Sequence, residues 1–224
     1  GTFLRRRSLI RFDSRHVGHV FTDVLIVGAG AAGLRAALAA AESAEVLVLT
    51  KGEIRQSNTY DAQGGIAAVL DPDDTLEAHV ADTLACAAGL GDEEVIRSVI
   101  AEAPRAVEEV IGWGLPVDQE DGRPALGREG GHSRSRIIHA EGDATGKHLA
   151  DTLIAHAGRS ERIKIFEGCY AIDLVTDADR EAWRAPRVER MPDQARTLDD
   201  LLAMAPENRS VLAALYFDDR DRVW

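Results

Sequence analysis

Cysteines, aromatic residues and long apolar runs are all scarce in this chain. Its 224 residues include two cysteines, Cys86 and Cys169, which lie far apart and form no Cys-x-x-Cys pair. A disulfide framework and a cysteine metal site are therefore not expected, and a reducing cytoplasm is the expected compartment. No apolar run approaches the ~20 residues of a membrane-spanning helix, so no membrane partner is expected. Low aromatic content (5%) combined with abundant alanine is typical of α/β enzymes.

Positive charge is concentrated at the start of a chain that is acidic overall, with a formal net charge of −12. The first twenty residues hold five arginines against a single acid, so residues 1–21 are expected to form a flexible basic leader. Residues 6–10 (RRSLI) match a twin-arginine export signal only in part, because no apolar segment follows them. The acidic remainder argues against nucleic acid as a partner.

The glycine-rich stretch at residues 23–33, DVLIVGAGAAG, is the most informative one in the chain. It joins an apolar strand to an alanine-rich helix. Gly28 permits a tight turn, Gly30 lets a pyrophosphate approach the backbone, and Gly33 lets helix and strand pack closely. The N–H groups at the start of the helix favour phosphate. The stretch predicts a dinucleotide site whose phosphate cradle also includes Ala29, Ala31 and Ala32.

The sequence after this helix leaves the identity of the dinucleotide open. Residues 45–50 (EVLVLT) form a second apolar strand, so residues 22–50 are expected to make a β-α-β unit. A conventional NAD site has an acidic residue at the end of the second strand. Thr50 and Lys51 stand there instead. Threonine can hydrogen-bond a ribose, and lysine is compatible with the 2′-phosphate of NADP.

The remaining pattern predicts helices separated by loops and a second group of strands. Four helices are expected: one opening near Gly64, and others over 75–88, over 92–112 and from Thr145. Asp143 and Thr145 are the expected N-caps of the last one. Residues 114–140 are expected to be loop with short strand pairs, and strands are expected at 162–166, 169–176 and 211–217. Residues 177–209 are expected to be a polar surface insertion with a short helix at 198–204. A further strand is expected to begin at 222–224, which suggests the N-terminal part of a longer protein.

Several motifs resemble those of the flavoproteins that comprise fumarate reductases, succinate dehydrogenases and L-aspartate oxidases. They stand in the same order and spacing at 57–68 (SNTYDAQGGIAA), 82–84 (DTL), 127–133 (GREGGHS) and 139–146 (HAEGDATG). Over residues 22–176 the chain is most similar to the N-terminal half of the L-aspartate oxidase branch. The resemblance implies a Rossmann-like α/β FAD-binding domain over 22–224, with a parallel sheet, helical insertions and a β-meander, truncated before the substrate-capping domain.

Two residues favour the L-aspartate oxidase branch. In succinate dehydrogenases and fumarate reductases a histidine within Ser-His-Thr usually carries the flavin covalently, whereas this chain has Asn58 in that place. An amide cannot form that bond, so the FAD is expected to be non-covalent. Those relatives also usually have glutamate where this chain has Gln63.

The resemblance assigns roles to the residues of the cofactor site. The glycines at 28–33 would hold the pyrophosphate, with Thr50 and Lys51 at the adenosine ribose. The segment along the ribityl chain and isoalloxazine ring would comprise Asn58, Thr59, Tyr60, Asp61, Ala62, Gln63, Gly64 and Gly65. A helix beginning near Gly64 would favour negative charge on reduced flavin.

The resemblance also places a substrate region in the loop of residues 127–139. Glu129 would meet the α-ammonium of aspartate, a group that succinate and fumarate lack. Arg128 and Arg136 would pair with Glu129 or bind a substrate carboxylate bidentately. His132 and His139 either hydrogen-bond substrate or serve as structural partners. The catalytic candidates are Glu129, His132 and Arg136.

The function implied is FAD-dependent oxidation of L-aspartate to iminoaspartate, the first step of de novo NAD biosynthesis. Electrons would pass to oxygen or fumarate, and a functional link to quinolinate synthase is expected. The family's proton-transfer arginine and capping domain come later in the sequence, so the isolated chain is expected to be inactive. Three alternatives stay open: a flavoprotein subunit of a succinate dehydrogenase or fumarate reductase, a non-catalytic nucleotide-binding fragment, and an NADP-dependent reductase, which rests only on Lys51.

Overall fold

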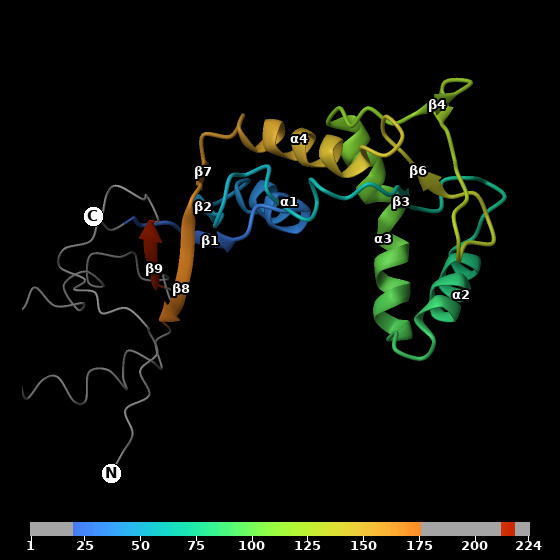
Figure 1. Cartoon of the computed structure of the whole chain (residues 1–224), viewed down its shortest axis with the longest axis horizontal. Coiled ribbons are helices and arrows are strands. Elements are labelled where there is room, and N and C mark those ends of the chain that lie inside the picture. The colour runs from blue at the N-terminus through green and yellow to red at the C-terminus, as the bar shows by residue number, and fades with distance from the viewer. Residues whose placement is uncertain (1–19, 176–211, 218–224) are drawn as a thin grey trace, which may run out of the picture. The chain divides into compact units, whose positions relative to one another are not determined.

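The computed structural model of the chain describes residues 20–175 and 212–217. Nearly all of the predicted leader and the whole predicted insertion at 177–209, with its helix at 198–204, lie outside these residues, as does the predicted strand at 222–224. The described residues fall into two compact units (Figure 1). The first unit comprises those within 1–29, 39–53 and 162–224, and the second those within 30–38 and 54–161.

A parallel three-stranded sheet forms the centre of the first unit. Its strands are β1 (Val24–Val27), β2 (Val46–Leu49) and β7 (Ile163–Phe166), in the order β1-β2-β7. Every residue of β2 is buried, as expected for the central strand of a parallel sheet. Helix α1 (Ala31–Ala40) connects β1 to β2 along the chain, so the predicted β-α-β unit and parallel sheet are confirmed.

An antiparallel pair of strands completes the first unit. Strand β8 (Cys169–Val175) pairs with β9 (Leu212–Phe217), as the sequence predicts for both segments, and the register shifts between Ala171 and Asp173. At the start of β8 the side chain of Cys169 is buried against Leu47 and Leu49. This burial raises the pKa of the Cys169 thiol.

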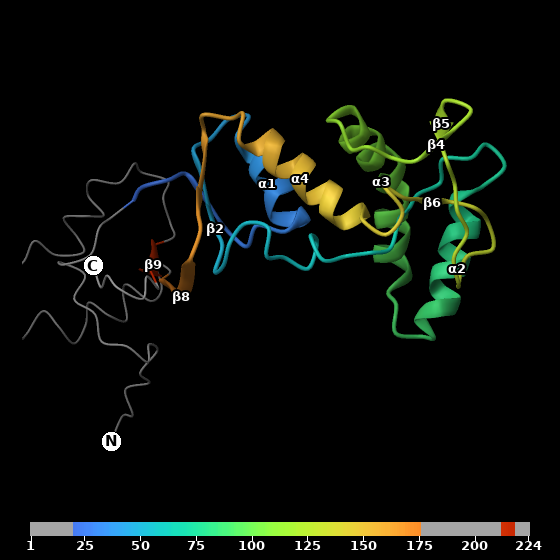
Figure 2. The same cartoon turned by 45° about the horizontal axis from the view of Figure 1, so that its top comes forward.

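Two helices joined by a short loop form one side of the second unit. Helices α2 (Leu76–Ala87) and α3 (Glu93–Gly112) lie side by side in Figures 1 and 2. The Thr75 hydroxyl accepts a hydrogen bond from Ala78 N, and Asp92 Oδ1 accepts from Glu94 N and Val95 N. These caps satisfy backbone donors that the first turn of a helix leaves unpaired. Both helices are confirmed close to their predicted bounds.

The core of the second unit lies where short strands meet α3. Strand β3 (Ile66–Ala67) pairs antiparallel with β6 (Ile137–Ile138), with Ile66 opposite Ile138. Apolar side chains from this ladder, from the C-terminal half of α3 and from the residues that follow β3 and α3 are buried together, among them Ala68, Val107, Leu115 and Ile138. Strands β4 (Gln119–Glu120) and β5 (Arg123–Pro124) form a hairpin, so the predicted mixture of loop and short strand pairs is confirmed. Helix α4 (Thr145–Ala157) follows and begins where predicted.

Two predictions of local structure are wrong. The helix expected to open near Gly64 is absent, and residues 66–67 form β3 instead. Two consecutive glycines disfavour a helix, whereas Ile66 gains a partner strand. The N-cap of α4 is Ala144, which makes no side-chain capping bond. The Thr145 hydroxyl accepts from Ala140 N, so it ties the preceding loop to the helix.

Within the described part of the chain, no helix combines the length and the apolar character that crossing a membrane requires.

Candidate functional site

A cavity of about 340 Å³ lies in the second unit, and the residues that line it come from three segments. Six of them are predicted cofactor residues: Ala31, Asn58, Thr59, Ala62, Gly64 and Gly65. The other four are Ile66, Thr145, Gly146 and Leu149. Small side chains leave backbone accessible to a ligand, and Asn58 and the two threonines add polar groups. This donor set fits an extended, polar-edged group such as a flavin nucleotide.

A compact turn over residues 57–62 forms one wall of the cavity. Tyr60 N donates to Ser57 Oγ and Asp61 N donates to the Ser57 carbonyl. The Thr59 hydroxyl accepts a hydrogen bond of 3.0 Å from Ala31 N, at the first residue of α1. Thr59 therefore ties this turn to the helix start that the sequence predicts as a phosphate cradle.

The first turn of α4 packs against the 57–62 turn so closely that there is no room for a side chain at Gly146. Gly146 N donates to the Ala62 carbonyl at 3.0 Å. A Cβ atom on Gly146 would lie 2.5 Å from that carbonyl oxygen and in contact with the Thr59 carbonyl. Glycine at position 146 is therefore required for α4 to close the cavity.

The remaining predicted cofactor residues do not line this cavity. Tyr60, Asp61 and Gln63 belong to the adjoining turn, and Ala32 and Gly33 lie in α1. Gly30 directly precedes α1, and a Cβ added to it would lie 3.3 Å from Thr59 Oγ1. Four residues belong to the first unit: Gly28, Ala29, Thr50 and Lys51. Gly28 has φ +105°, a conformation that side-chain-bearing residues rarely adopt, so its predicted role in a tight turn is supported. Thr50 is buried and Lys51 is exposed.

Glu129 forms a hydrogen-bonded pair with His139. The distance from Glu129 Oε1 to His139 Nε2 is 2.8 Å, and the exposed fractions of the side chains are 50% and 25%. The imidazole lies against Gly65, where an added Cβ would be 2.9 Å from His139 Nε2. The structure thus brings Glu129, by way of His139, beside the predicted flavin segment.

Arg136 is held by two other carboxylates, so the first of its two alternative predicted roles, pairing with Glu129, is wrong. Its guanidinium, with no exposed surface, donates from Nε and Nη2 to Asp74 at 2.7 and 2.8 Å, and from Nη1 to Asp82 at 2.6 Å. Hydrogen bonds from Arg136 lower the pKa of Asp74. A guanidinium occupied in this way is not free to bind a substrate carboxylate bidentately.

The same cluster anchors the loop that carries Glu129. Ser133 donates to Asp82 Oδ2 from both its N–H and its hydroxyl, each at 2.8 Å. These bonds, together with the one from Arg136, hold the pKa of Asp82 well below its usual range. His132 Nδ1 lies 3.2 Å from Arg136 Nη1, so His132 joins Asp74, Asp82, Ser133 and Arg136 in the loop anchor and does not line the cavity.

His79 is a buried histidine at the edge of the anchor. Its ring centroid lies 5.6 Å from that of His132, and its Nδ1 has no hydrogen-bond partner among the described residues. Desolvation, followed by repulsion from Arg136, lowers the pKa of His79. The neutral imidazole is therefore the favoured form at this position.

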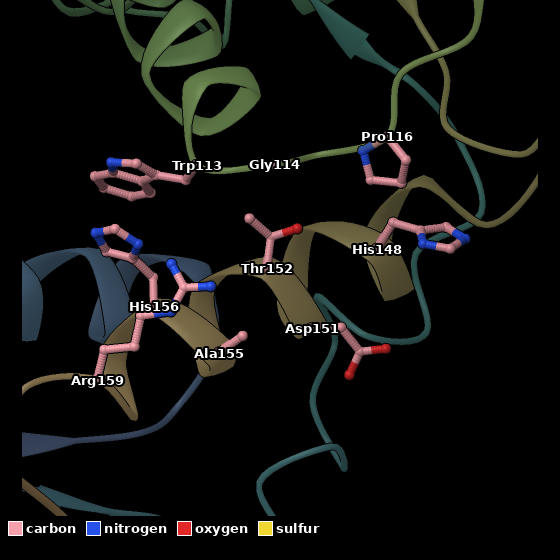
Figure 3. A pocket seen from close by; sticks show the side chains of 9 residues that line it. All are labelled: Trp113, Gly114, Pro116, His148, Asp151, Thr152, Ala155, His156 and Arg159. Carbon is pink, nitrogen blue, oxygen red and sulfur yellow. The ribbon is translucent and has the colours of Figure 1, made fainter.

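A second cavity, of about 430 Å³, lies between α4 and the segment that follows α3 (Figure 3). Trp113 stacks on His156 there, with ring centroids 4.5 Å apart and an interplanar angle of 15°. The Arg35 guanidinium lies 5.5 Å from the centroid of the Trp113 ring and pairs with Glu109. No predicted cofactor or substrate residue lines this cavity, and the stacking accounts for its aromatic side chains.

Sequence reasoning missed three parts of the site. Three residues of α4 line the cavity: Thr145 and Gly146, which end the 139–146 motif, and Leu149, which follows it, whereas the sequence predicts only a helix start there. Asp74 and Asp82 are the unrecognised partners of Arg136. No local signal could identify them, because they lie 62 and 54 residues from it in the chain. His139 was expected to matter less than His132, yet it is the histidine beside Gly65.

Comparison with known proteins identifies a domain family and two groups of relatives. The FAD binding domain family matches residues 23–212. The L-aspartate oxidase of Pseudomonas aeruginosa is 43% identical over 172 residues, which cover 73% of this chain and 31% of that protein. The chloroplastic L-aspartate oxidase of Arabidopsis thaliana is 44% identical over 160 residues, covering 71% of this chain and 24% of that protein.

Solved structures of related flavoproteins share the fold. Quinol fumarate reductase FrdA from E. coli superposes with a TM-score of 0.67 and 34% identity, over 70% of this chain and 27% of that chain. Sdh1 from Mycobacterium smegmatis gives a TM-score of 0.64 and 30% identity, over 70% of this chain and 29% of that chain. The chain thus spans less than a third of the length of these relatives.

Proposed function

We propose that this chain, which belongs to the FAD binding domain family, is the FAD-binding part of an L-aspartate oxidase. The protein would oxidise L-aspartate to iminoaspartate, the first step of de novo NAD biosynthesis. Bound FAD supplies the hydride acceptor in such a reaction. Oxygen or fumarate then receives the electrons, the enzyme acts in the cytoplasm, and its imine product is the functional link to quinolinate synthase.

The proposal assigns each part of the cofactor site to its own residues. The backbone of residues 28–33 binds the pyrophosphate, and Thr50 and Lys51 bind the adenosine ribose. The turn at 57–62, with Gln63, Gly64 and Gly65, lies along the ribityl chain and the ring. Support comes from the cavity that Asn58, Gly64 and Gly65 share with α4.

The observation that carries the choice of branch is Asn58 in the lining of this cavity. The dehydrogenases and fumarate reductases that the chain resembles usually carry a flavin-bonding histidine in this place. An amide does not form that bond, so we propose that the FAD is held without a covalent link. The identity of 43–44% to proteins named L-aspartate oxidase supports the same branch.

In the substrate region Glu129 is proposed to bind the α-ammonium group of aspartate. Its carboxylate is half exposed, and it reaches the flavin segment through His139. Arg136 and His132 are proposed to act as positioning residues, because their contacts are with Asp74, Asp82 and each other. Substrate selectivity then depends on Glu129, whose partner group succinate and fumarate lack.

The experiment that tests this function is anaerobic reduction of the flavin in the protein expressed from its whole coding sequence. L-Aspartate and succinate are added separately, and bleaching of the flavin absorbance is followed. We expect bleaching by L-aspartate alone, and its loss in Glu129→Gln with the FAD content unchanged. Bleaching by succinate alone would overturn the proposal.

A succinate- or fumarate-converting flavoprotein is the second candidate. It is favoured by the structural similarity to quinol fumarate reductase FrdA, with a TM-score of 0.67. That candidate predicts reduction by succinate and no effect of the amino group on binding, so the same titration separates the two functions.

A further inference from the structure

The antiparallel ladder of β3 and β6 brings His139 to the flavin segment. Because Ile66 pairs with Ile138 and Ala67 with Ile137, the next position along the register sets Gly65 opposite His139. Because Gly65 has no Cβ, the imidazole packs directly against its backbone, beside the Ile137 side chain and the Ile138 carbonyl. The position of this ring is therefore determined by backbone pairing and close packing.

A second glycine confines the imidazole along the adjoining Cε1–Nδ1 edge. An added Cβ on Gly127 would lie 3.3 Å from His139 Cε1 and 3.6 Å from His139 Nδ1. Gly127 N also donates to the Ile137 carbonyl, which fixes its distance from β6. With two of its edges against glycine backbone, the ring has Nε2 directed to Glu129 Oε1 at 2.8 Å.

We propose that His139 is a positioning residue that sets the orientation of the Glu129 carboxylate and thereby confers selectivity for an α-ammonium group. The inference rests on the proposed function. One carboxylate oxygen, Oε1, accepts from His139, and the other is left to accept from the ligand. A half-exposed glutamate has several rotamers, and the hydrogen bond to a confined ring selects one of them. Ligands without an amino group gain nothing from this arrangement.

The test compares two ligands that differ in a single group. α-Methyl-L-aspartate carries an ammonium where 2,2-dimethylsuccinate carries a methyl group, and neither has a hydrogen on that carbon to transfer as hydride. Dissociation constants are measured from the change in flavin absorbance, in the FAD-loaded protein expressed from its whole coding sequence. Selectivity for the ammonium is the ratio of the dissociation constant of 2,2-dimethylsuccinate to that of α-methyl-L-aspartate.

Three substitutions separate positioning from packing. His139→Phe fills the same space without a donor, and we expect it to lower the ratio about tenfold while binding of 2,2-dimethylsuccinate is unchanged. His139→Gln places an amide N–H near the original Nε2 and should retain most of the selectivity. His139→Asn keeps a polar side chain but moves the donor away, so it should resemble the phenylalanine variant and serves if that variant does not fold.

The controls distinguish failure of this inference from failure of the proposed function. His156→Phe makes the same change at the histidine that stacks on Trp113 and should leave the ratio unaltered. If Glu129→Gln abolishes selectivity but the His139 variants keep it, the positioning role is wrong and the proposed function stands. Equal weakening of both ligands by His139→Phe would also overturn the positioning role. If Glu129→Gln itself leaves the ratio unchanged, the proposed role of Glu129 is wrong as well.

Discussion

The adjacent glycines Gly64 and Gly65 have different surroundings, although the sequence alone gives no reason to distinguish them. A Cβ on Gly65 would lie 2.5 Å from the Ile138 carbonyl oxygen and in contact with the Ile137 side chain. A Cβ on Gly64 would meet no atom within 4 Å. The need for glycine at position 65 is therefore steric and comes from a strand that is distant in the chain.

We expect Gly65→Ala to lower the free energy of unfolding by about 1–3 kcal/mol and to weaken FAD binding, because the β3–β6 ladder must open to admit a methyl group. Urea titration and flavin fluorescence quenching measure the two effects. Gly64→Ala is the matched control and should leave stability close to that of the wild type. Equal effects of the two substitutions would contradict the steric account.

Arg136 provides a second prediction at the residue scale. Replacing it with leucine leaves Asp74 and Asp82 without their counter-charge, and Asp74 is nearly fully buried. Removing one partner of a buried ion pair typically costs about 3–5 kcal/mol, which we expect as the loss in unfolding free energy. Arg105→Leu breaks an exposed pair with Glu102 on α3 and should have a far smaller effect. Similar losses in both variants would argue against burial as the cause.

The helices and the parallel strands could be predicted because their signals are local. Apolar runs mark β1 and β2, and Thr75 and Asp92 mark the starts of α2 and α3. The prediction of a helix after Gly64 is wrong because this segment pairs with β6. Residues near Gly64 in the sequence carry no signal of that pairing. The partners of Arg136 were missed for the same reason. Local sequence patterns predict helices and strands. The arrangement of Glu129, His139 and Arg136 depends instead on contacts between segments that are distant in the chain.

At the scale of α2, the buried His79 predicts a dependence of stability on pH. Its pKa in the folded protein is lowered below 6.5 by burial. As the pH falls through 6.5, the unfolded state takes up a proton that the folded state does not, so the unfolding free energy decreases until the lowered pKa is reached. We expect His79→Leu to reduce this decrease between pH 7.5 and 5.5, as measured by urea unfolding. An identical pH dependence in the two proteins would contradict it.

Asp74 and Asp82, the two carboxylates of the loop anchor, affect stability at lower pH than His79 does. Because the pKa values of Asp74 and Asp82 are depressed below 3.8, their contribution to stability is present above that pH. It is lost as the pH falls through the depressed values. The effect of His79→Leu on stability therefore falls at higher pH than the protonation of Asp74 and Asp82, which would free the loop that carries Glu129.

For the whole molecule, the central prediction is that the flavin can be released without breaking a covalent bond. Acid precipitation of the FAD-loaded protein should leave all of the yellow colour in the supernatant, because Asn58 stands where related dehydrogenases usually have a flavin-bonding histidine. The absorbance of supernatant and pellet measures the partition. Flavin that stays with the precipitated polypeptide would contradict the non-covalent assignment.

Three parts of the chain line the cavity: Ala31 and residues within 58–66 and 145–149. They meet only when the second unit is folded. A ligand that binds only the folded form shifts the folding equilibrium in proportion to its concentration. Unfolded chains are removed by proteases, so the amount of this protein in a cell should follow the supply of flavin. Riboflavin limitation would then lower the amount of folded protein, and the vitamin would act as a regulator of protein abundance.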